Sequence, residues 1–209
     1  MSCTTILVGK KASYDGSTII ARDDDSGSGR YDPKKFVVVA PQEQPRHYRS
    51  VLSHVEFDLP DNPCRYSIVP NVLPNRGILA EAGVSERNVA MSATETIGCT
   101  GAICEADPYL DTGIEEAEIP TVLLSEASTA KEAVDLLLSI YDTEGCAGGS
   151  GVFIADDKET WYIENASGTQ YVVLKLSSSM AFAQPNMSII GLIDLDDTEN
   201  VIASKDVIA

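Results

Sequence analysis

Two reactive side chains stand near the beginning of the chain. Cys3 opens the apolar run CTTILVG, and Arg22 is followed by three aspartates. A thiol is a nucleophile only as its thiolate, so it needs a base and benefits from a nearby cation. If Met1 and Ser2 were removed, Cys3 would carry a free α-amine, and the pKa of such an amine, about 8, suits a base at neutral pH. One residue would then hold both the nucleophile and its base.

A histidine base is not needed in this scheme, and the sequence does not favour one. The two histidines, His47 and His54, lie in a polar stretch that also contains Gln44, Arg46 and Arg49. Polar and charged neighbours of this kind are typical of the protein surface. The sequence therefore argues against a cysteine–histidine arrangement.

The elements around Cys3 predict a β-hairpin. Residues 3–9 and 18–22 are β-prone runs joined by a Tyr-Asp-Gly-Ser turn. Because antiparallel strands return the end of the second beside the start of the first, we expect Arg22 to lie next to Cys3. There its guanidinium would stabilise a thiolate. Asp25 would hold the ammonium group of the nucleophile or of a substrate.

The rest of the chain predicts strands on both sides of a helical pair. Thr129 and Glu132 form a capping-box pattern before apolar residues at three- and four-residue steps, which predicts a helix that ends at Gly145, and a second helix is expected at 119–127. This order indicates an α+β fold or a layered αββα arrangement. Further strands are expected at residues 36–40, 66–69, 78–83, 88–93, 151–155, 160–165, 170–176 and 180–183.

Length and charge limit the size and the partners of the protein. A chain of 209 residues with 44% hydrophobic content can build one sizeable core, so we expect a single domain over residues 1–209. The formal net charge of −17 disfavours nucleic acids and anionic membranes as partners. No apolar run approaches the roughly 18 residues that a membrane-spanning helix needs.

The cysteines predict neither a disulfide framework nor a zinc site. Their number is five, with no Cys-x-x-Cys spacing and only two histidines. We therefore expect the four cysteines other than Cys3 to be packing or loop thiols in a reducing cytoplasm; these are Cys64, Cys99, Cys104 and Cys146.

Several stretches carry a resemblance to a known family. The segments CTTILVG at 3–9, ASYDGS at 12–17 and ARDDD at 21–25 are similar to the start of the peptidase family C69 dipeptidases of lactic acid bacteria, which are N-terminal nucleophile hydrolases. EAGVSE at 81–86, NVAMSATE at 88–95 and WYIE at 161–164 agree with it. The resemblance covers about residues 3–190.

The resemblance implies a fold, an activity and a set of site residues. The fold would be the αββα sandwich of the N-terminal nucleophile hydrolases, and the activity would be cleavage of dipeptides without a cofactor. Cys3 would be the nucleophile, with Arg22 and Asp25 beside it. The amide of Asn186 would donate to the oxyanion of the tetrahedral intermediate. The second oxyanion donor is left open, with a backbone N–H near Thr94 as one option.

Two alternatives to a dipeptidase stay open. One is a related acylase that cleaves penicillin V or a conjugated bile acid, and the other is a non-catalytic assembly or binding domain. Members of the family are about twice this length, and Ser204 could begin only a single helical turn before the chain stops. We therefore expect the chain to be the N-terminal portion of a longer protein. A homo-oligomer is the usual expectation for a soluble enzyme.

Overall fold

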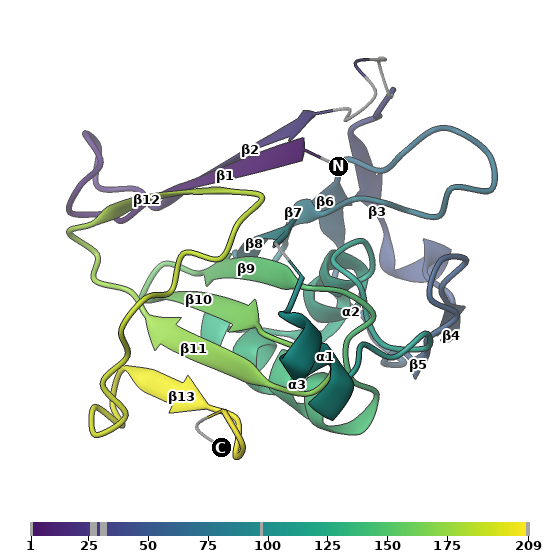
Figure 1. The fold of residues 1–209 in the computed structure, drawn as a ribbon. Coiled ribbons are helices and arrows are strands. Elements are labelled where there is room, and N and C mark those ends of the chain that lie inside the picture. The colour runs from purple at the N-terminus through teal and green to yellow at the C-terminus, as the bar shows by residue number, and fades with distance from the viewer. Residues whose placement is uncertain (1, 26–28, 30–32, 97, 208–209) are drawn as a thin grey trace.

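Two β-sheets lie face to face in this chain (Figure 1). The computed structural model describes residues 2–25, 29, 33–96 and 98–207. The smaller sheet has the strand order β12-β1-β2, and the larger has the order β13-β11-β10-β9-β8-β7-β6-β3. A separate hairpin pairs β4 with β5.

A strand-rich first half, which also contains the 3-10 helix η1, is followed by three α-helices and then by a second set of strands. The strands are β1 (Ser2–Val8), β2 (Ile19–Asp25), β3 (Val37–Val39), β4 (His47–Arg49), β5 (Glu56–Asp58), β6 (Tyr66–Ile68), β7 (Ala82–Ser85), β8 (Ala90–Glu95), β9 (Ser150–Ala155), β10 (Thr160–Asn165), β11 (Tyr171–Lys175), β12 (Ala181–Pro185) and β13 (Val201–Ala203). The helices are η1 (Pro41–Glu43), α1 (Gly101–Ala106), α2 (Ile119–Glu126) and α3 (Ala130–Thr143).

The predicted N-terminal hairpin is confirmed by the pairing of β1 with β2. Its turn is closed by Asp15, whose carboxylate accepts hydrogen bonds from the backbone N–H and the hydroxyl of Ser17 at 3.0 and 2.6 Å. Gly16 supplies the positive φ of 79° that the turn requires. The register places Cys3 opposite Asp24, so the start of β1 lies beside the end of β2.

Both predicted helices are present as α2 and α3. The hydroxyl of Thr129 caps α3 by accepting from the N–H of Glu132 at 3.1 Å, and the Glu132 carboxylate accepts from the N–H of Ser128 at 2.9 Å. Gly145, with φ of 71°, follows the C-cap and ends the helix as expected. The buried face of α3 packs on the large sheet; its residues are Ala130, Ala133, Val134, Leu137, Leu138, Ile140 and Tyr141.

Alternation along β9 divides the core into two parts. Val152 and Ile154 belong to the apolar cluster under the helices. Phe153, between them in the chain, points to the other face and packs with Leu7 and Tyr162 between the two sheets. The helices and the small sheet therefore cover opposite faces of the large sheet.

The α+β class and the face-to-face sheets agree with the sequence-based expectation. The layers run helices, large sheet, small sheet (Figure 1). Within the described residues no helix packs on the outer face of the small sheet. Three of the four layers of an αββα sandwich are thus found in this part of the chain. No helix in the described ranges is long and apolar enough to cross a membrane.

The strand predicted at 78–83 begins later than expected. Leu79 and Glu81 have φ values of 44° and 45°, which are incompatible with an extended strand, so β7 starts only at Ala82. The sequence gives no sign of this turn because neither residue is the glycine or asparagine that favours positive φ.

After Ser204 the described residues 205–207 form a turn, in which the N–H of Val207 donates to the carbonyl of Ser204 at 3.3 Å; the rest of the helical turn expected there lies outside the described residues. Ser204 follows β13, its hydroxyl accepts from the N–H of Tyr171 at 3.0 Å, and it donates to the side chain of Gln170 at 2.7 Å. Its side chain therefore ties the end of β13 to the start of β11.

Candidate active site

Cys3 and Arg22 are in direct contact, as the hairpin predicted. Nη2 of Arg22 donates to Sγ of Cys3 at 3.0 Å. Cys3 is 2% exposed, and the side chain of Arg22 is 7% exposed. A cation therefore lies against the thiol in a site shielded from water, where its electrostatic effect is large.

A backbone carbonyl and a hydroxyl of β8 hold the arginine in place. Arg22 donates from Nη1 to the carbonyl of Ala93 and to the hydroxyl of Thr94, the latter at 3.0 Å. Thr5 of β1 reaches the hydroxyls of Ser92 and Thr94, each at 2.7 Å. The inner faces of β1 and β8 are thus polar near Cys3, and this polar layer orients the guanidinium.

Asp24, and not Asp25, lies beside the nucleophile. Oδ1 of Asp24 accepts from Sγ of Cys3 at 3.3 Å. Residues of β2 alternate between the inner and the outer face, so Arg22 and Asp24 share the inner face while Asp25 is exposed on the other. The expectation that Asp25 approaches Cys3 is therefore not met, because it lies an odd number of residues from Arg22.

Lys34 joins Asp24 to a buried glutamate. Its ammonium lies 2.6 Å from Oδ2 of Asp24 and 2.8 Å from Oε2 of Glu81, and it also donates to the carbonyl of Leu79 at 2.6 Å. Burial alone would raise the pKa of Asp24, but the hydrogen bond and charge of Lys34 outweigh it and lower this pKa. Burial prevails at Glu81, which is 0% exposed, and raises its pKa in spite of Lys34.

Asn186 reaches the backbone of Cys3. Its Oδ1 accepts from the N–H of Cys3, and its Nδ2 donates to the carbonyl of Glu95 at 2.9 Å. The pairing of β12 with β1, which sets Pro185 opposite Thr4, brings this residue across 183 positions of sequence. One of the two N–H bonds of the amide is used by Glu95, so the other is the one that could face an oxyanion.

Thr94 is also close to the site through its side chain, which contacts Thr5 and Arg22. It is fully buried in β8. A backbone oxyanion donor near this residue stays a prediction.

Burial sets the state of the thiol. Removal from water raises the pKa of Cys3 to about 12; the charge of Arg22 lowers it, while the hydrogen bond and charge of Asp24 and the charge of Glu116 raise it. In the chain with Met1-Ser2 attached, the thiol is therefore neutral at physiological pH, since the single guanidinium does not offset burial.

Glu116 is a further carboxyl group near the site. Burial raises its pKa to about 8, against the charge of Arg22 and together with the charges of Glu81 and Glu95. Its Oε2 is buried and has no hydrogen-bond partner within the described residues. It carries a proton near neutral pH.

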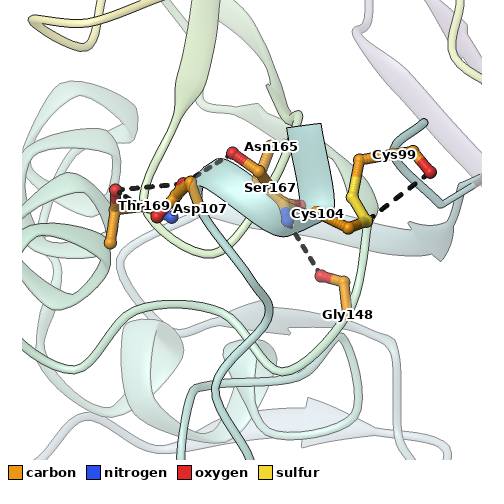
Figure 2. Close-up of a disulfide and its surroundings, with 7 residues drawn as sticks. All are labelled: Cys99, Cys104, Asp107, Gly148, Asn165, Ser167 and Thr169. Atoms are coloured by element: carbon orange, nitrogen blue, oxygen red, sulfur yellow. Dashed lines mark hydrogen bonds between the residues drawn. A yellow bond between two sulfur atoms is a disulfide. The ribbon is translucent and has the colours of Figure 1, made fainter. Parts of the chain in front are cut away.

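Two cysteines expected to be free thiols form a disulfide. Cys99 and Cys104 are bonded, with their Cα atoms 5.9 Å apart, at the start of α1 (Figure 2). The end of this helix is tied to the turn between β10 and β11 through Asp107, which accepts from the hydroxyl of Ser167 at 2.6 Å and the N–H of Thr169 at 2.8 Å. The sequence did not reveal this bond because the helix that brings the two residues together was not predicted.

The other two cysteines are the packing thiols that the sequence predicted, and His47 lies at the surface as expected. Cys64 and Cys146 are free and buried. His47 is exposed and lies between Glu56 and Asp58 on the small hairpin. Within the described ranges, no group of three or more histidine, cysteine, aspartate or glutamate side chains is arranged to hold a metal ion.

Three charged residues of the site were missed from the sequence. Asp24 was available from the alternation of β2, since it lies two residues from Arg22. Lys34 and Glu81 gave no local signal, because they enter the site through the packing of loops outside the hairpin.

Comparisons with known proteins match the whole chain. The model of the family described as peptidase family C69 matches residues 2–209. The chain is 45% identical over 206 residues to a probable dipeptidase A of Streptococcus pyogenes serotype M3 (strain SSI-1), covering 99% of this chain and 44% of that protein. It is 43% identical over 209 residues to a dipeptidase of Bifidobacterium longum (strain NCC 2705), covering 94% and 39%.

A solved structure is also similar. Penicillin V acylase from Agrobacterium tumefaciens gives a TM-score of 0.46 at 16% identity, covering 83% of this chain and 49% of that one. The chain spans less than half the length of the curated relatives that it matches. The family model, by contrast, runs from the strand that carries the cysteine to the last residue, and on this match the chain belongs to peptidase family C69.

Proposed function

We propose that the protein containing this chain is a cysteine dipeptidase of the N-terminal nucleophile type. The observation that carries the proposal is the contact between the thiol of Cys3 and the guanidinium of Arg22 at the start of the first strand. The names of the relatives at 45% and 43% identity support peptide-bond hydrolysis as the reaction.

The proposed mechanism uses the α-amine of Cys3 after loss of Met1-Ser2. The amine takes the thiol proton, and Sγ attacks the carbonyl carbon of the peptide bond. The tetrahedral intermediate collapses with cleavage of the C–N bond, and the proton passes to the leaving amino group. Water then attacks the thioester, the carboxylic acid is released, and the thiol regains its proton.

The neighbours of Cys3 take matching roles. Arg22 stabilises the thiolate, and the free N–H of the Asn186 amide donates to the oxyanion. Asp24, which faces the thiol, replaces Asp25 as the carboxylate of the site. Asp25 keeps no role in this proposal because its side chain lies on the outer face.

The freshly exposed amine also changes the electrostatics of the thiol. In the chain as described, the Cys3 nitrogen is an amide that donates to Asn186. When the neutral α-amine that replaces it takes the thiol proton, the ammonium that forms places a positive charge next to the sulfur and stabilises the thiolate, which lowers the thiol pKa from its value of about 12. Removal of the two residues therefore both creates the base and activates the nucleophile.

Further features of the protein belong to the same proposal. The substrate is a dipeptide; the protein has neither nucleic-acid nor membrane partners, is a homo-oligomer and works in the cytoplasm. The Cys99–Cys104 disulfide removes one argument for a reducing compartment. The −17 charge still supports the absence of nucleic-acid partners.

The test is a substrate panel on the purified full-length protein. We expect hydrolysis of dipeptides and little hydrolysis of penicillin V or a conjugated bile acid. Cys3→Ala abolishes the activity, and Cys3→Ser leaves little, because a hydroxyl is far less acidic than a thiol. Cys64→Ala, which removes another buried thiol, is the matched control and keeps the activity.

Preferred cleavage of penicillin V would favour the acylase alternative. Dipeptide hydrolysis at the parent rate by Cys3→Ala would show that the nucleophile is assigned wrongly. Lack of any hydrolysis by a correctly processed protein would favour the non-catalytic alternative.

A further inference from the structure

Lys34 stands between the nucleophile and a strained turn, and nothing in the proposed chemistry uses it. We propose that Lys34 is a positioning residue of this site: its ammonium holds the Asp24 carboxylate against Cys3 and fastens it to the turn at residues 79–81. The inference rests on the proposed function only in taking Cys3 as the reactive thiol.

The geometry is a continuous chain of short contacts. Sγ of Cys3 lies 3.3 Å from Oδ1 of Asp24, whose Oδ2 lies 2.6 Å from Nζ of Lys34. The same ammonium lies 2.8 Å from Oε2 of Glu81 and donates to the carbonyl of Leu79 at 2.6 Å. All three N–H donors of one ammonium thus have an acceptor, and one of these acceptors touches the nucleophile.

The burial of these groups makes the arrangement electrostatically strong. The exposed fractions of the Lys34, Asp24 and Glu81 side chains are 15%, 20% and 0%. A buried carboxylate is stable as an anion only with a partner, and Lys34 is the cation that contacts Glu81. A lysine held by two carboxylates in this way cannot swing away from Asp24 without leaving Glu81 unpaired.

The turn on the far side of Lys34 is strained. Leu79 and Glu81 both have positive φ, a conformation that costs free energy for residues other than glycine. The lysine binds the carbonyl of the first and the side chain of the second. In addition, the carbonyl of Glu81 accepts from the N–H of Ala93, whose own carbonyl binds Arg22. The strained turn therefore supports both charged neighbours of Cys3.

The charge of Lys34 acts on the carboxylate of Asp24, which contacts the thiol. Among the residues that the structure describes, the ionisable groups that face Cys3 or Asp24 are Arg22 from β2, Lys34 and Glu81 from the loops before β3 and β7, and Glu116 from the segment before α2. Arg22 and Lys34 are the cations of this set, so loss of Lys34 leaves the thiol facing uncompensated carboxylates. The thiol then ionises less readily.

The experiment measures the alkylation of Cys3 by iodoacetamide as a function of pH on the processed full-length protein that begins at Cys3, with the modified peptide quantified by mass spectrometry. This readout needs no substrate. We expect Lys34→Met to move the midpoint of alkylation upward by about one pH unit, which is about tenfold slower reaction at a fixed pH below the midpoint. Lys34→Arg, which keeps the charge, restores most of the rate.

Two further variants separate positioning from folding. Lys34→Met leaves Glu81 unpaired, so the double variant Lys34→Met with Glu81→Gln is compared with Glu81→Gln alone, and the same upward shift is expected. Lys175→Met removes an ion pair of 2.7 Å to Glu159 on another part of the large sheet and serves as the control with an unchanged midpoint.

The proposal is overturned if Lys34→Met, either alone or combined with Glu81→Gln, folds and leaves the pH midpoint of Cys3 alkylation unchanged. A lysine with a purely structural role would change the melting temperature alone. A shift of the same size in Lys175→Met overturns it as well. A protein in which Cys3 responds to Lys34 but which hydrolyses no dipeptide supports this inference and contradicts the proposed function.

Discussion

At the nucleophile, burial and charge oppose each other. Cys3 is almost fully buried, which raises its pKa, while Arg22 at 3.0 Å lowers it. The carboxylate of Asp24 also contacts the sulfur, and it disfavours the thiolate. The state of this thiol therefore depends on the balance of charges within a few ångströms, and small changes in that balance alter its reactivity.

The two adjacent aspartates provide a matched pair of variants. Asp24→Asn favours the thiolate, but it removes the carboxylate proposed to hold the ammonium group of the nucleophile or of a substrate, so we expect kcat/KM for dipeptides to fall at least about tenfold. Asp25→Asn changes an exposed side chain on the outer face of β2, and kcat/KM should stay within about twofold. Steady-state kinetics on the processed full-length protein checks both values.

A larger loss in Asp25→Asn than in Asp24→Asn would contradict this assignment. It would mean that the active form of β2 presents the other face to the nucleophile. Circular dichroism of both variants excludes loss of the fold as the cause.

At the scale of the elements, a carboxyl group is buried where α2 begins. Glu118 is 3% exposed and accepts hydrogen bonds from the hydroxyl of Ser50 at 2.6 Å and the N–H of Glu115 at 3.1 Å. Burial nevertheless raises its pKa to about 7. The first turn of α2 thus begins at a carboxyl group that ionises less readily than an exposed one, because the two hydrogen-bond donors do not replace the water that Glu118 loses on burial.

This shift predicts a pH-dependent stability. Between the ordinary glutamate pKa near 4.5 and about 7, folded Glu118 keeps a proton that the unfolded chain has lost. Its contribution to the free energy of unfolding therefore falls as pH rises through this range, by an amount on the order of 3 kcal/mol. Glu118→Gln, which cannot ionise, should raise the melting temperature at pH 8.5 and change it little at pH 4.5.

Thermal unfolding of the two proteins at both pH values measures the effect. Glu126→Gln, on the exposed side of the same helix, is the control and should behave like the parent protein. Equal melting temperatures of parent and Glu118→Gln at pH 8.5 would contradict the raised pKa.

At the scale of the whole molecule, the site joins segments that are far apart in the chain. Cys3 comes from β1, Arg22 and Asp24 from β2, and Asn186 from the segment after β12. The central position of β1 in the small sheet, between β2 and β12, accounts for this convergence. The same sheet packs on β8, which supplies the acceptors that hold the arginine.

This organisation predicts that activity depends on processing of the N-terminus. With Met1-Ser2 attached, the Cys3 nitrogen is an amide and cannot act as a base, so the unprocessed protein should be inactive. We expect activity to rise in proportion to the fraction of chains that begin at Cys3. We also expect Cys3→Ala to retain Met1-Ser2, because Cys3 makes the cut itself.

Intact-mass spectrometry and the dipeptidase rate, measured on the same full-length samples, check this relation. Full activity with both residues retained would refute the α-amine mechanism. It would redirect attention to His47 and His54, although both are exposed.

Local patterns in the sequence determined the N-terminal hairpin, the helix α3 and the first contact of the site. The hairpin at residues 3–22, the capped helix α3 and the proximity of Cys3 and Arg22 follow from turn residues, apolar spacing and antiparallel geometry. The choice of Asp24 over Asp25 is also contained in the alternation of a strand, because residues an even number apart share a face.

Only the tertiary structure decided the remainder. Lys34 binds both Asp24 and Glu81, and Glu81 belongs to a turn whose positive φ values occur at residue types that do not predict them. The Cys99–Cys104 disulfide depends on a short helix that the sequence did not predict. Asn186 is placed by a strand pairing across 183 residues. Spacing along the chain fixes which face a side chain occupies, but which faces meet is set by the packing of the sheets against each other, and that packing is a property of the whole fold.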